Sequence, residues 1–261
     1  MIHTIVIGNT TTRFAWFVGR RLVKSRSMLT AALRCDELPA PGRAAGVAIA
    51  SVVPDMTRIV RDHVRAAVQM EAFVLGPRAR TGLKFHYRRL DIGADRVGAA
   101  VGAHRRFPGQ DVIVFDFGTA ATANVILAEG IFAGGVILPG IQMSLDALAD
   151  YTAGLPKLSP ERLRDPLQRN TRGAIRAGVA NLFAGGIDRI VSEVERNTGR
   201  TFRVIATGGG ARTARRYSGR IAAVYPQLAS EGLAEIFRIN RRPSDDVGAR
   251  GRPQARGHDT R

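Results

Sequence analysis

The chain has 261 residues, 45% of them hydrophobic and 23% charged, so it can bury a sizeable core as one large domain or two small lobes. No apolar stretch is long enough to span a bilayer, and the first apolar run is too quickly interrupted to be a secretory signal. The single cysteine, Cys35, cannot form an internal disulfide. We therefore expect a cytoplasmic protein without membrane contact. The formal net charge of +17 comes mostly from scattered arginines without interleaved aromatic residues, which favours a solvated basic surface over nucleic-acid binding.

The first half of the chain opens with apolar runs separated by glycine turns, a pattern typical of strands joined by hairpins. The expected strands cover residues 2–7, 11–18, 22–25 and 47–53. Apolar residues at helical spacing predict a helix over 57–70, with Asp55 available as its N-terminal cap. A helix of small residues is expected over 97–103.

The second half repeats this order. Its expected elements are strands at 111–115, 121–127, 131–138 and 203–206 and helices at 143–151 and 174–195. Strand, polar glycine turn, strand, glycine turn and strand thus occur twice, which predicts an α/β chain of two similar lobes, at 1–108 and 109–238. The segment 239–261 is basic, rich in glycine and proline and almost without apolar residues, so we expect a disordered tail.

Three glycine-rich turns follow expected strands: Gly8-Asn9-Thr10, Gly118-Thr119-Ala120 and Gly208-Gly209-Gly210. Glycine lets the backbone approach a phosphate, and threonine hydroxyls can add hydrogen bonds to its oxygens. None of the turns is a P-loop, because the Gly-Lys-Ser/Thr signature is absent from the sequence. Each turn alone is a weak signal, but together they favour a nucleotide cleft between two lobes.

Two aspartates and one arginine are candidates for chemistry. Asp116 ends an apolar strand beside a glycine turn, where a carboxylate can hold a cation or simply cap the turn. Asp95, near a helix start, could be a cap or a general base, and spacing alone favours the cap. Arg96 could pair with a substrate carboxylate. The five histidines show no metal-ligand spacing.

In order and spacing, these segments resemble the type III pantothenate kinase family over nearly the whole chain up to about Arg238. The segments that carry the resemblance are Gly8-Asn9-Thr10, Ser51-Val52-Val53-Pro54, Thr81-Gly82-Leu83 through Tyr87, Gly93-Ala94-Asp95-Arg96, Asp116-Phe117-Gly118-Thr119, Gly134-Gly135, Pro139-Gly140, Asn170-Thr171 and Thr207-Gly208-Gly209. The resemblance implies an actin-like fold of two ribonuclease-H-like units, as in acetate and sugar kinases, Hsp70 and actin. It also implies a homodimer that phosphorylates pantothenate with ATP and Mg²⁺, the first step toward coenzyme A.

The resemblance also implies roles for individual residues. Asp95 would accept the proton of the pantothenate hydroxyl, and Asp116 would bind a monovalent cation, K⁺ or NH₄⁺. The residues implied to contact pantothenate are Tyr87, Gly93, Ala94, Asp95, Arg96 and, from a neighbouring subunit, Thr171. The residues implied to contact ATP are Val6, Ile7, Gly8, Asn9, Thr10, Thr11, Thr12, Arg13 and Thr119.

The chain departs from the family pattern in the first phosphate motif. Val6 stands where the family has aspartate, and the internal repeat places Val6 over Asp116. Arg13 stands where lysine is usual, and Asn124 where members often have aspartate. Two hypotheses remain open: an active kinase, favoured by the retained catalytic motifs, and a catalytically degenerate relative that binds a ligand or nucleic acid as a regulatory protein, favoured by Val6 and the basic charge.

Overall fold

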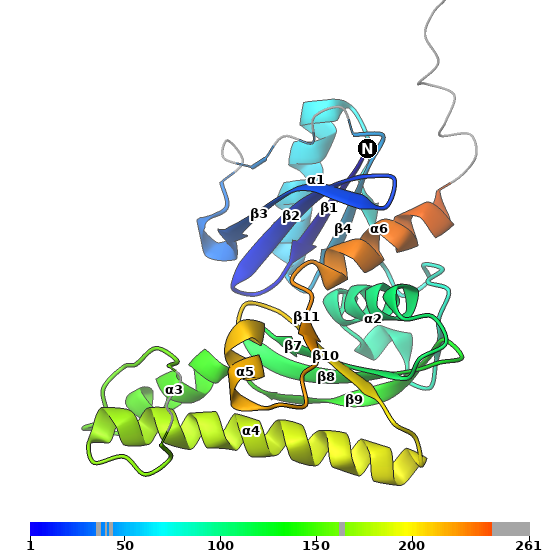
Figure 1. Ribbon diagram of the computed structural model, residues 1–261. Coiled ribbons are helices and arrows are strands. Elements are labelled where there is room, and N and C mark those ends of the chain that lie inside the picture. The colour runs from blue at the N-terminus through cyan, green and yellow to red at the C-terminus, as the bar shows by residue number, and fades with distance from the viewer. Residues whose placement is uncertain (35–37, 40, 42–43, 162–164, 242–261) are drawn as a thin grey trace, which may run out of the picture.

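The computed structural model describes residues 1–34, 38–39, 41, 44–161 and 165–241. They form two mixed β-sheets, one above the other, with helices on both faces of each (Figure 1). The first sheet has the order β3-β2-β1-β4-β5, with strands β1 (Ile2–Ile7), β2 (Thr11–Val18), β3 (Arg21–Leu29), β4 (Gly46–Ser51) and β5 (Phe73–Val74). The second has the order β11-β10-β7-β8-β9-β6, with strands β6 (Lys84–Phe85), β7 (Val112–Phe117), β8 (Ala120–Leu127), β9 (Ile131–Pro139), β10 (Arg203–Thr207) and β11 (Ala223–Val224).

The two sheets are copies of one unit. Strands β1, β2 and β3 have 6, 8 and 9 residues, and so do β7, β8 and β9. Both triplets are antiparallel meanders, and a parallel strand follows each, β4 beside β1 and β10 beside β7. The predicted α/β duplication is therefore confirmed, and it makes Val6 in β1 and Asp116 in β7 equivalent, each fifth in its strand.

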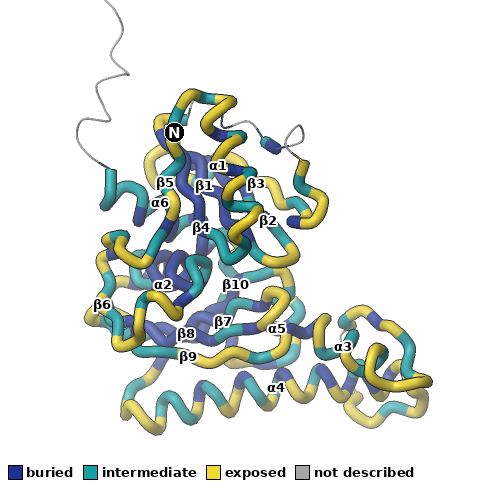
Figure 2. Tube along the Cα trace, turned by 180° about the vertical axis from the view of Figure 1, so that it is seen from behind, coloured by how far each residue is buried: buried dark blue, intermediate teal, exposed yellow. Residues whose placement is uncertain are grey.

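Helices form the remaining layers. They are α1 (Pro54–Val68), α2 (Ala94–Arg106), α3 (Ile141–Asp150), α4 (Thr171–Thr198), α5 (Ala211–Tyr217) and α6 (Leu228–Asn240), with short 3₁₀ turns at Thr30–Ala32 and Arg89–Asp91. Alternate residues of β1 and β7 are buried against different helices, so both faces of these central strands carry buried apolar side chains. Figure 2 shows these strands mostly buried, whereas α4 alternates between buried and exposed positions.

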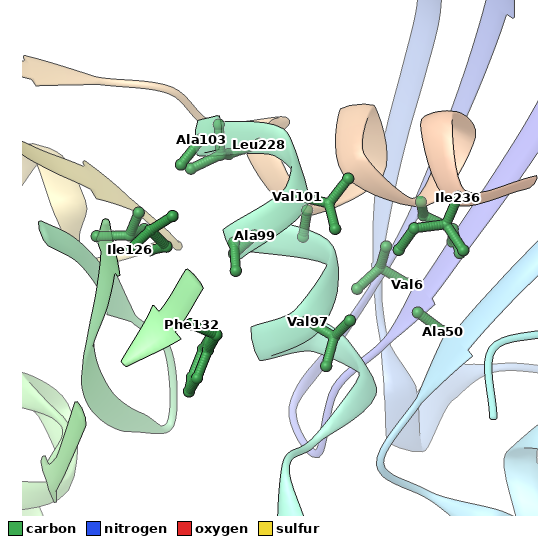
Figure 3. Close-up of a cluster of buried hydrophobic side chains, with 14 of the residues drawn as sticks. Val6, Ala50, Val97, Ala99, Val101, Ala103, Ile126, Phe132, Leu228 and Ile236 are labelled. Carbon is green, nitrogen blue, oxygen red and sulfur yellow. The ribbon is translucent and has the colours of Figure 1, made fainter. Parts of the chain in front are cut away.

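Helices α2 and α6 are packed between the two sheets and join them. Their apolar side chains form one cluster with Val6 and Ala50 of the first sheet and Phe132 of the second (Figure 3). The two helices cross so closely that a Cβ atom on Gly232 would lie 1.8 Å from the carbonyl oxygen of Gly98. Only glycine permits this approach of backbone to backbone.

Several boundaries differ from expectation. Helix α1 begins at Pro54 after Val53, and no side chain caps it, so Asp55 lies in the first turn and is not the cap. The expected division at residue 108 does not separate the sheets cleanly, because β6 pairs with β9 and α6 returns to pack on β1 and β4. Residues 239 and 240 of the expected tail are helical, Arg241 follows, and 242–261 lie outside the described residues. No described helix is long and apolar enough to cross a membrane.

Candidate active site

Two of the predicted glycine turns lie side by side where the sheets meet. The turn after β1 and the turn after β7 bring Thr10 and Thr119 together, with 2.7 Å between their hydroxyl oxygens. In each turn the glycine N–H donates back across the hairpin, from Gly8 to Thr11 O at 3.1 Å and from Gly118 to Ala120 O at 3.2 Å. Both hydroxyls belong to exposed residues, so an incoming phosphate can reach them.

The third glycine turn lies against the second. Gly208 follows β10 with a φ of 92°, and a Cβ there would lie 2.4 Å from Oδ1 of Asp116 and 2.6 Å from Phe117 O. The N–H of Gly210 donates to the same Phe117 carbonyl at 2.9 Å. The close approach explains why this position is glycine, and it seals one side of the Asp116 carboxylate.

Asp116 shares its electrostatic environment with two other predicted residues. Burial and, second, the negative charge of Asp95 raise the pKa of Asp116 to about 6, while the Arg13 guanidinium opposes this shift. Arg13 comes from β2, where it pairs with Val6, and its Nη1 donates to the carbonyl of Pro226 at 3.2 Å. The fold thus brings together a carboxylate from each half of the duplication and one guanidinium.

Val6 contributes no charge to this group of residues. Its side chain is 7% exposed and points into the cluster with Ala50, Val97 and Ile236 (Figure 3). Among the described residues no group of three or more His, Cys, Asp or Glu side chains could hold a metal ion. The residues present therefore fit a divalent cation that takes most of its ligands from phosphate and water.

Not every residue expected to contact ATP faces the turns. Ile7 is fully buried on the α1 side of the first sheet. Thr12 is also buried, and its hydroxyl bonds Thr30 Oγ1 at 3.0 Å, whose own hydroxyl donates to Gly8 O at 2.7 Å. These hydrogen bonds stabilise the first turn on its buried side. Asn9 and Thr10 are exposed, and Thr11 is partly exposed.

Asp95 and Arg96 open helix α2. The N-cap residue is Gly93, without a side-chain cap, so Asp95 is not the cap that spacing alone favoured. Its Oδ1 accepts a hydrogen bond from the Arg96 N–H at 2.8 Å. A Cβ on Gly93 would lie 2.5 Å from that oxygen, so glycine there leaves room for the carboxylate. Ala94 is the first residue of the helix.

The Arg96 side chain lies against strand β8 of the second sheet. It is buried, and its Nε donates to Oδ1 of Asn124 at 2.7 Å. Its guanidinium carbon lies 5.7 Å from the Phe132 ring centroid and 5.9 Å from that of Tyr87. In the described part of the chain no carboxylate lies within 4 Å of this cation. A buried cation without a counter-ion is costly, and an anionic ligand would compensate it.

Thr171 is separate from these residues. It is exposed at the start of α4, which packs beside α3 on one face of the second sheet, while α2 covers the other (Figure 1). Within one chain, the helices that carry Thr171 and Asp95 therefore lie on opposite faces of the second sheet.

Some residues at the site were not among the predicted contacts. The Phe132 ring lies beside the Arg96 guanidinium. Gly135 is the register partner of Asn124, and a Cβ on Gly135 would lie 3.1 Å from Arg96 Nη2. Asn124 was noticed only as a departure from the family pattern. The available signal was the position of Gly134-Gly135 in the middle of a strand, where glycine marks a close approach.

A second group of arginines lies near Arg13. Arg212, Arg215 and Arg216 of α5 line an open pocket of about 570 Å³ together with Val224 and Pro226, the residue whose carbonyl accepts from Arg13. No carboxylate of the described residues is within 4 Å of these three side chains. The pocket extends the positive potential of the phosphate turns.

Comparison with known proteins identifies the family. A family model described as type III pantothenate kinase matches residues 4–193. A type III pantothenate kinase of Desulfosudis oleivorans is 35% identical, covering 90% of this chain and 98% of its own, and one of Rubrobacter xylanophilus is 34% identical, covering 92% and 98%.

Solved structures agree on the fold. A Campylobacter jejuni protein named for the Baf family superposes with a TM-score of 0.62 at 18% identity, covering 91% of this chain and 98% of its own. The Lmo2764 protein of Listeria monocytogenes gives 0.52 at 11% identity, covering 91% and 98%. The expected actin-like fold of two duplicated units is confirmed, and the chain belongs to the type III pantothenate kinase family.

Proposed function

We propose that this protein transfers the γ-phosphoryl group of ATP to the terminal hydroxyl of pantothenate, giving 4′-phosphopantothenate and ADP in the first step of coenzyme A biosynthesis. The observation that carries the proposal is the convergence of Asp95, Asp116 and Arg13 beside the paired phosphate turns, next to the buried Arg96 cation. Related proteins named as kinases support the enzyme over a non-catalytic regulatory protein.

Each group has a chemical part in this reaction. Arg96 pairs with the carboxylate of pantothenate, and the rings of Tyr87 and Phe132 lie beside its guanidinium. Asp95 accepts the proton of the hydroxyl as its oxygen forms the new bond to phosphorus, and the bond to the ADP oxygen breaks. Arg13 and the turn hydroxyls hold the phosphate oxygens in place, and the arginine pocket of α5 attracts the polyanion.

Cations complete the charge balance. Mg²⁺, when bound with ATP, neutralises charge on the transferred phosphate. Asp116 is the carboxylate that we assign to a monovalent cation, K⁺ or NH₄⁺, because its raised pKa reflects a buried negative charge lacking full compensation. Since Val6 supplies no oxygen, we expect a weaker hold on Mg²⁺ than two carboxylates would give.

We also infer a homodimer. If Thr171 contacts pantothenate, we expect it to do so at the site of a second subunit, because α4 and α2 lie on opposite faces of the second sheet. Helix α4 offers a surface for this contact, with Leu182 65% exposed and open space around Gly178 and Gly185. A cytoplasmic location suits this reaction and stays a proposal.

The test is a product assay with pantothenate, ATP, Mg²⁺ and K⁺ on the purified protein and on Asp95→Asn. The matched control is Asp91→Asn, the same change at an exposed carboxylate that pairs with Arg88 at 3.2 Å. We expect turnover in the wild type and the control and its loss in Asp95→Asn. Binding of pantothenate without turnover in the wild type would reject the kinase and leave a binding protein.

A further inference from the structure

Asp116 lies in a row of three side chains that carry oxygen atoms, across three neighbouring strands of the second sheet. It is in register with Thr207 of the parallel strand β10 on one side and with Thr122 of the antiparallel strand β8 on the other. Side chains in register on neighbouring strands point to the same face of a sheet. That face is the one covered by α2, because Val114 and Ile205, two residues before Asp116 and Thr207, belong to the cluster that α2 forms.

The hydroxyl of Thr207 is buried beside this carboxylate and is unpaired. Thr207 is fully buried, and its Oγ1 has no hydrogen-bond partner among the described residues. Thr122 differs, because its Oγ1 accepts a hydrogen bond from Asn124 Nδ2 at 3.3 Å. Leaving a buried hydroxyl unpaired is unfavourable, and a ligand bound between Thr207 and Asp116 would remove that cost.

The duplication supplies an internal comparison for this row. In the first sheet the equivalent positions on β4, β1 and β2 are also in register with one another, and they hold Ala50, Val6 and Arg13. Two of these residues are buried and apolar, and the third is a cation, so none offers an oxygen atom to a ligand. The row of hydroxyl, carboxylate and hydroxyl is therefore a property of the second sheet alone and does not follow from the shared fold.

The chemistry of this row suits a cation. A carboxylate and hydroxyl oxygens are ligands that hard cations take in proteins, whereas the negative charge of Asp116 would repel a phosphate. A threonine hydroxyl can offer a lone pair to a cation without losing its proton. The backbone at Gly208 follows Thr207 directly and closes one side of the carboxylate, so a cation held there would contact both side chains.

We propose that Thr207 supplies, through Oγ1, a second oxygen ligand to the monovalent cation held by Asp116. This inference rests on the proposed function, because the assignment of that cation to Asp116 belongs to it. The same hydroxyl has no other hydrogen-bonding role among the described residues, so its removal should weaken the hold on the cation and leave the cation-free protein intact.

The test is Thr207→Val, which keeps the branched shape and removes the hydroxyl. Tm is measured as K⁺ is added at fixed pH and ionic strength, with ATP and Mg²⁺ present and no pantothenate, so that the readout does not depend on turnover. We expect the K⁺ concentration that gives half of the rise in Tm to increase about tenfold or more. Without K⁺, the variant should melt at or above the wild-type temperature, because an unpaired buried hydroxyl has been replaced by a methyl group.

Two further variants separate the hydroxyl from packing. Thr207→Ser keeps an oxygen at this position and should keep a K⁺ response close to that of the wild type. Thr4→Val is the matched control, since Thr4 is also fully buried in a central strand, but its hydroxyl donates to Ala15 O at 3.3 Å in the first sheet. Its loss should leave the K⁺ response unchanged.

The inference is overturned if Thr207→Val, or Thr207→Ala should the former not fold, responds to K⁺ at the wild-type concentration. It is also overturned if Thr207→Ser loses as much of the response as Thr207→Val, or if the wild type shows no rise in Tm with K⁺. The proposed function is decided separately by the product assay: a wild type that phosphorylates pantothenate keeps it in each of these cases, and a wild type without turnover does not.

Discussion

Replacing Gly232 by alanine should loosen the junction between the two sheets. The new Cβ would lie 1.8 Å from Gly98 O and 2.6 Å from Gly102 N, and both of these are backbone atoms that cannot rotate away. Ordinary van der Waals contact begins at 3.4 Å, so α6 must withdraw from α2 by roughly 1.6 Å. The shift would also disturb the apolar cluster that both helices share with the two sheets.

The expected loss of stability follows from this overlap. Overpacking in a core costs about 1–3 kcal/mol, and backbone contacts place Gly232→Ala at the upper end. Better helix propensity returns about 1 kcal/mol, leaving a net loss of about 2 kcal/mol. For a chain of this size that lowers Tm by about 4–8 °C, which circular dichroism can follow. Because α2 carries Asp95 and Arg96 at its start, we also expect kcat/KM to fall.

Gly186→Ala in α4 is the matched control. It is the same substitution inside a helix, but nothing lies within 4 Å of the new Cβ. Only the propensity gain remains there, so Tm should stay level or rise slightly. The packing account of the α2–α6 crossing fails if Gly232→Ala melts at or above the wild-type temperature.

Three further predictions concern the site. Asp116→Asn should stabilise the cation-free protein at pH 7–8, because folding raises the pKa of Asp116 from 3.8 to about 6, so the ionised carboxylate of the wild type destabilises the folded state. The gain in Tm should shrink as the pH falls from 6 to 4, and a gain that does not change with pH would contradict this prediction. Val6→Asp places a carboxylate in the apolar cluster and should lower the free energy of unfolding by about 2–4 kcal/mol without metal. Mg²⁺ and ATP should then raise the Tm of the variant more than that of the wild type, and equal increases in Tm would exclude a new metal ligand. Asp95→Asn and Thr171→Glu should each be inactive alone. If each site uses two subunits, the two variants refolded together should recover about a quarter of wild-type activity, because about half of the dimers are mixed and each mixed dimer has one intact site. No recovery would exclude a shared site.

The sequence predicted the architecture because its strongest signals are local. Apolar runs bounded by glycine turns marked β1, β2, β7 and β8 to within a residue or two, and the repeat of those runs predicted two similar sheets. The elements that the sequence did not predict are defined by distant contacts. Strand β6 has two residues and exists because β9 pairs with it, and α6 packs back onto the first sheet through glycine contacts that have no local signature.

The same distinction applies to the site. Gly8, Thr10 and Thr119 lie in turns with a recognisable pattern, Asp116 lies in the strand that leads into the second turn, and the structure brings the two turns together. The surroundings of Arg96 could not be predicted from local pattern, because its hydrogen-bond partner Asn124 lies on a strand 28 residues further along the chain. Burial of Asn124 and the orientation of its amide depend on sheet register, which a single sequence does not specify.

The contact between Thr10 and Thr119 is a hydrogen bond between the two halves of the molecule that a ligand can replace. One exposed hydrogen bond of 2.7 Å links turns that are 109 residues apart, and either hydroxyl can be its donor. A phosphate between the turns offers an acceptor to both hydroxyls, so the single hydrogen bond between them is replaced by two hydrogen bonds to phosphate oxygens. Separating the two turns in the absence of nucleotide therefore breaks only one exposed hydrogen bond and costs little free energy. With nucleotide bound, its phosphate oxygens link the same two turns.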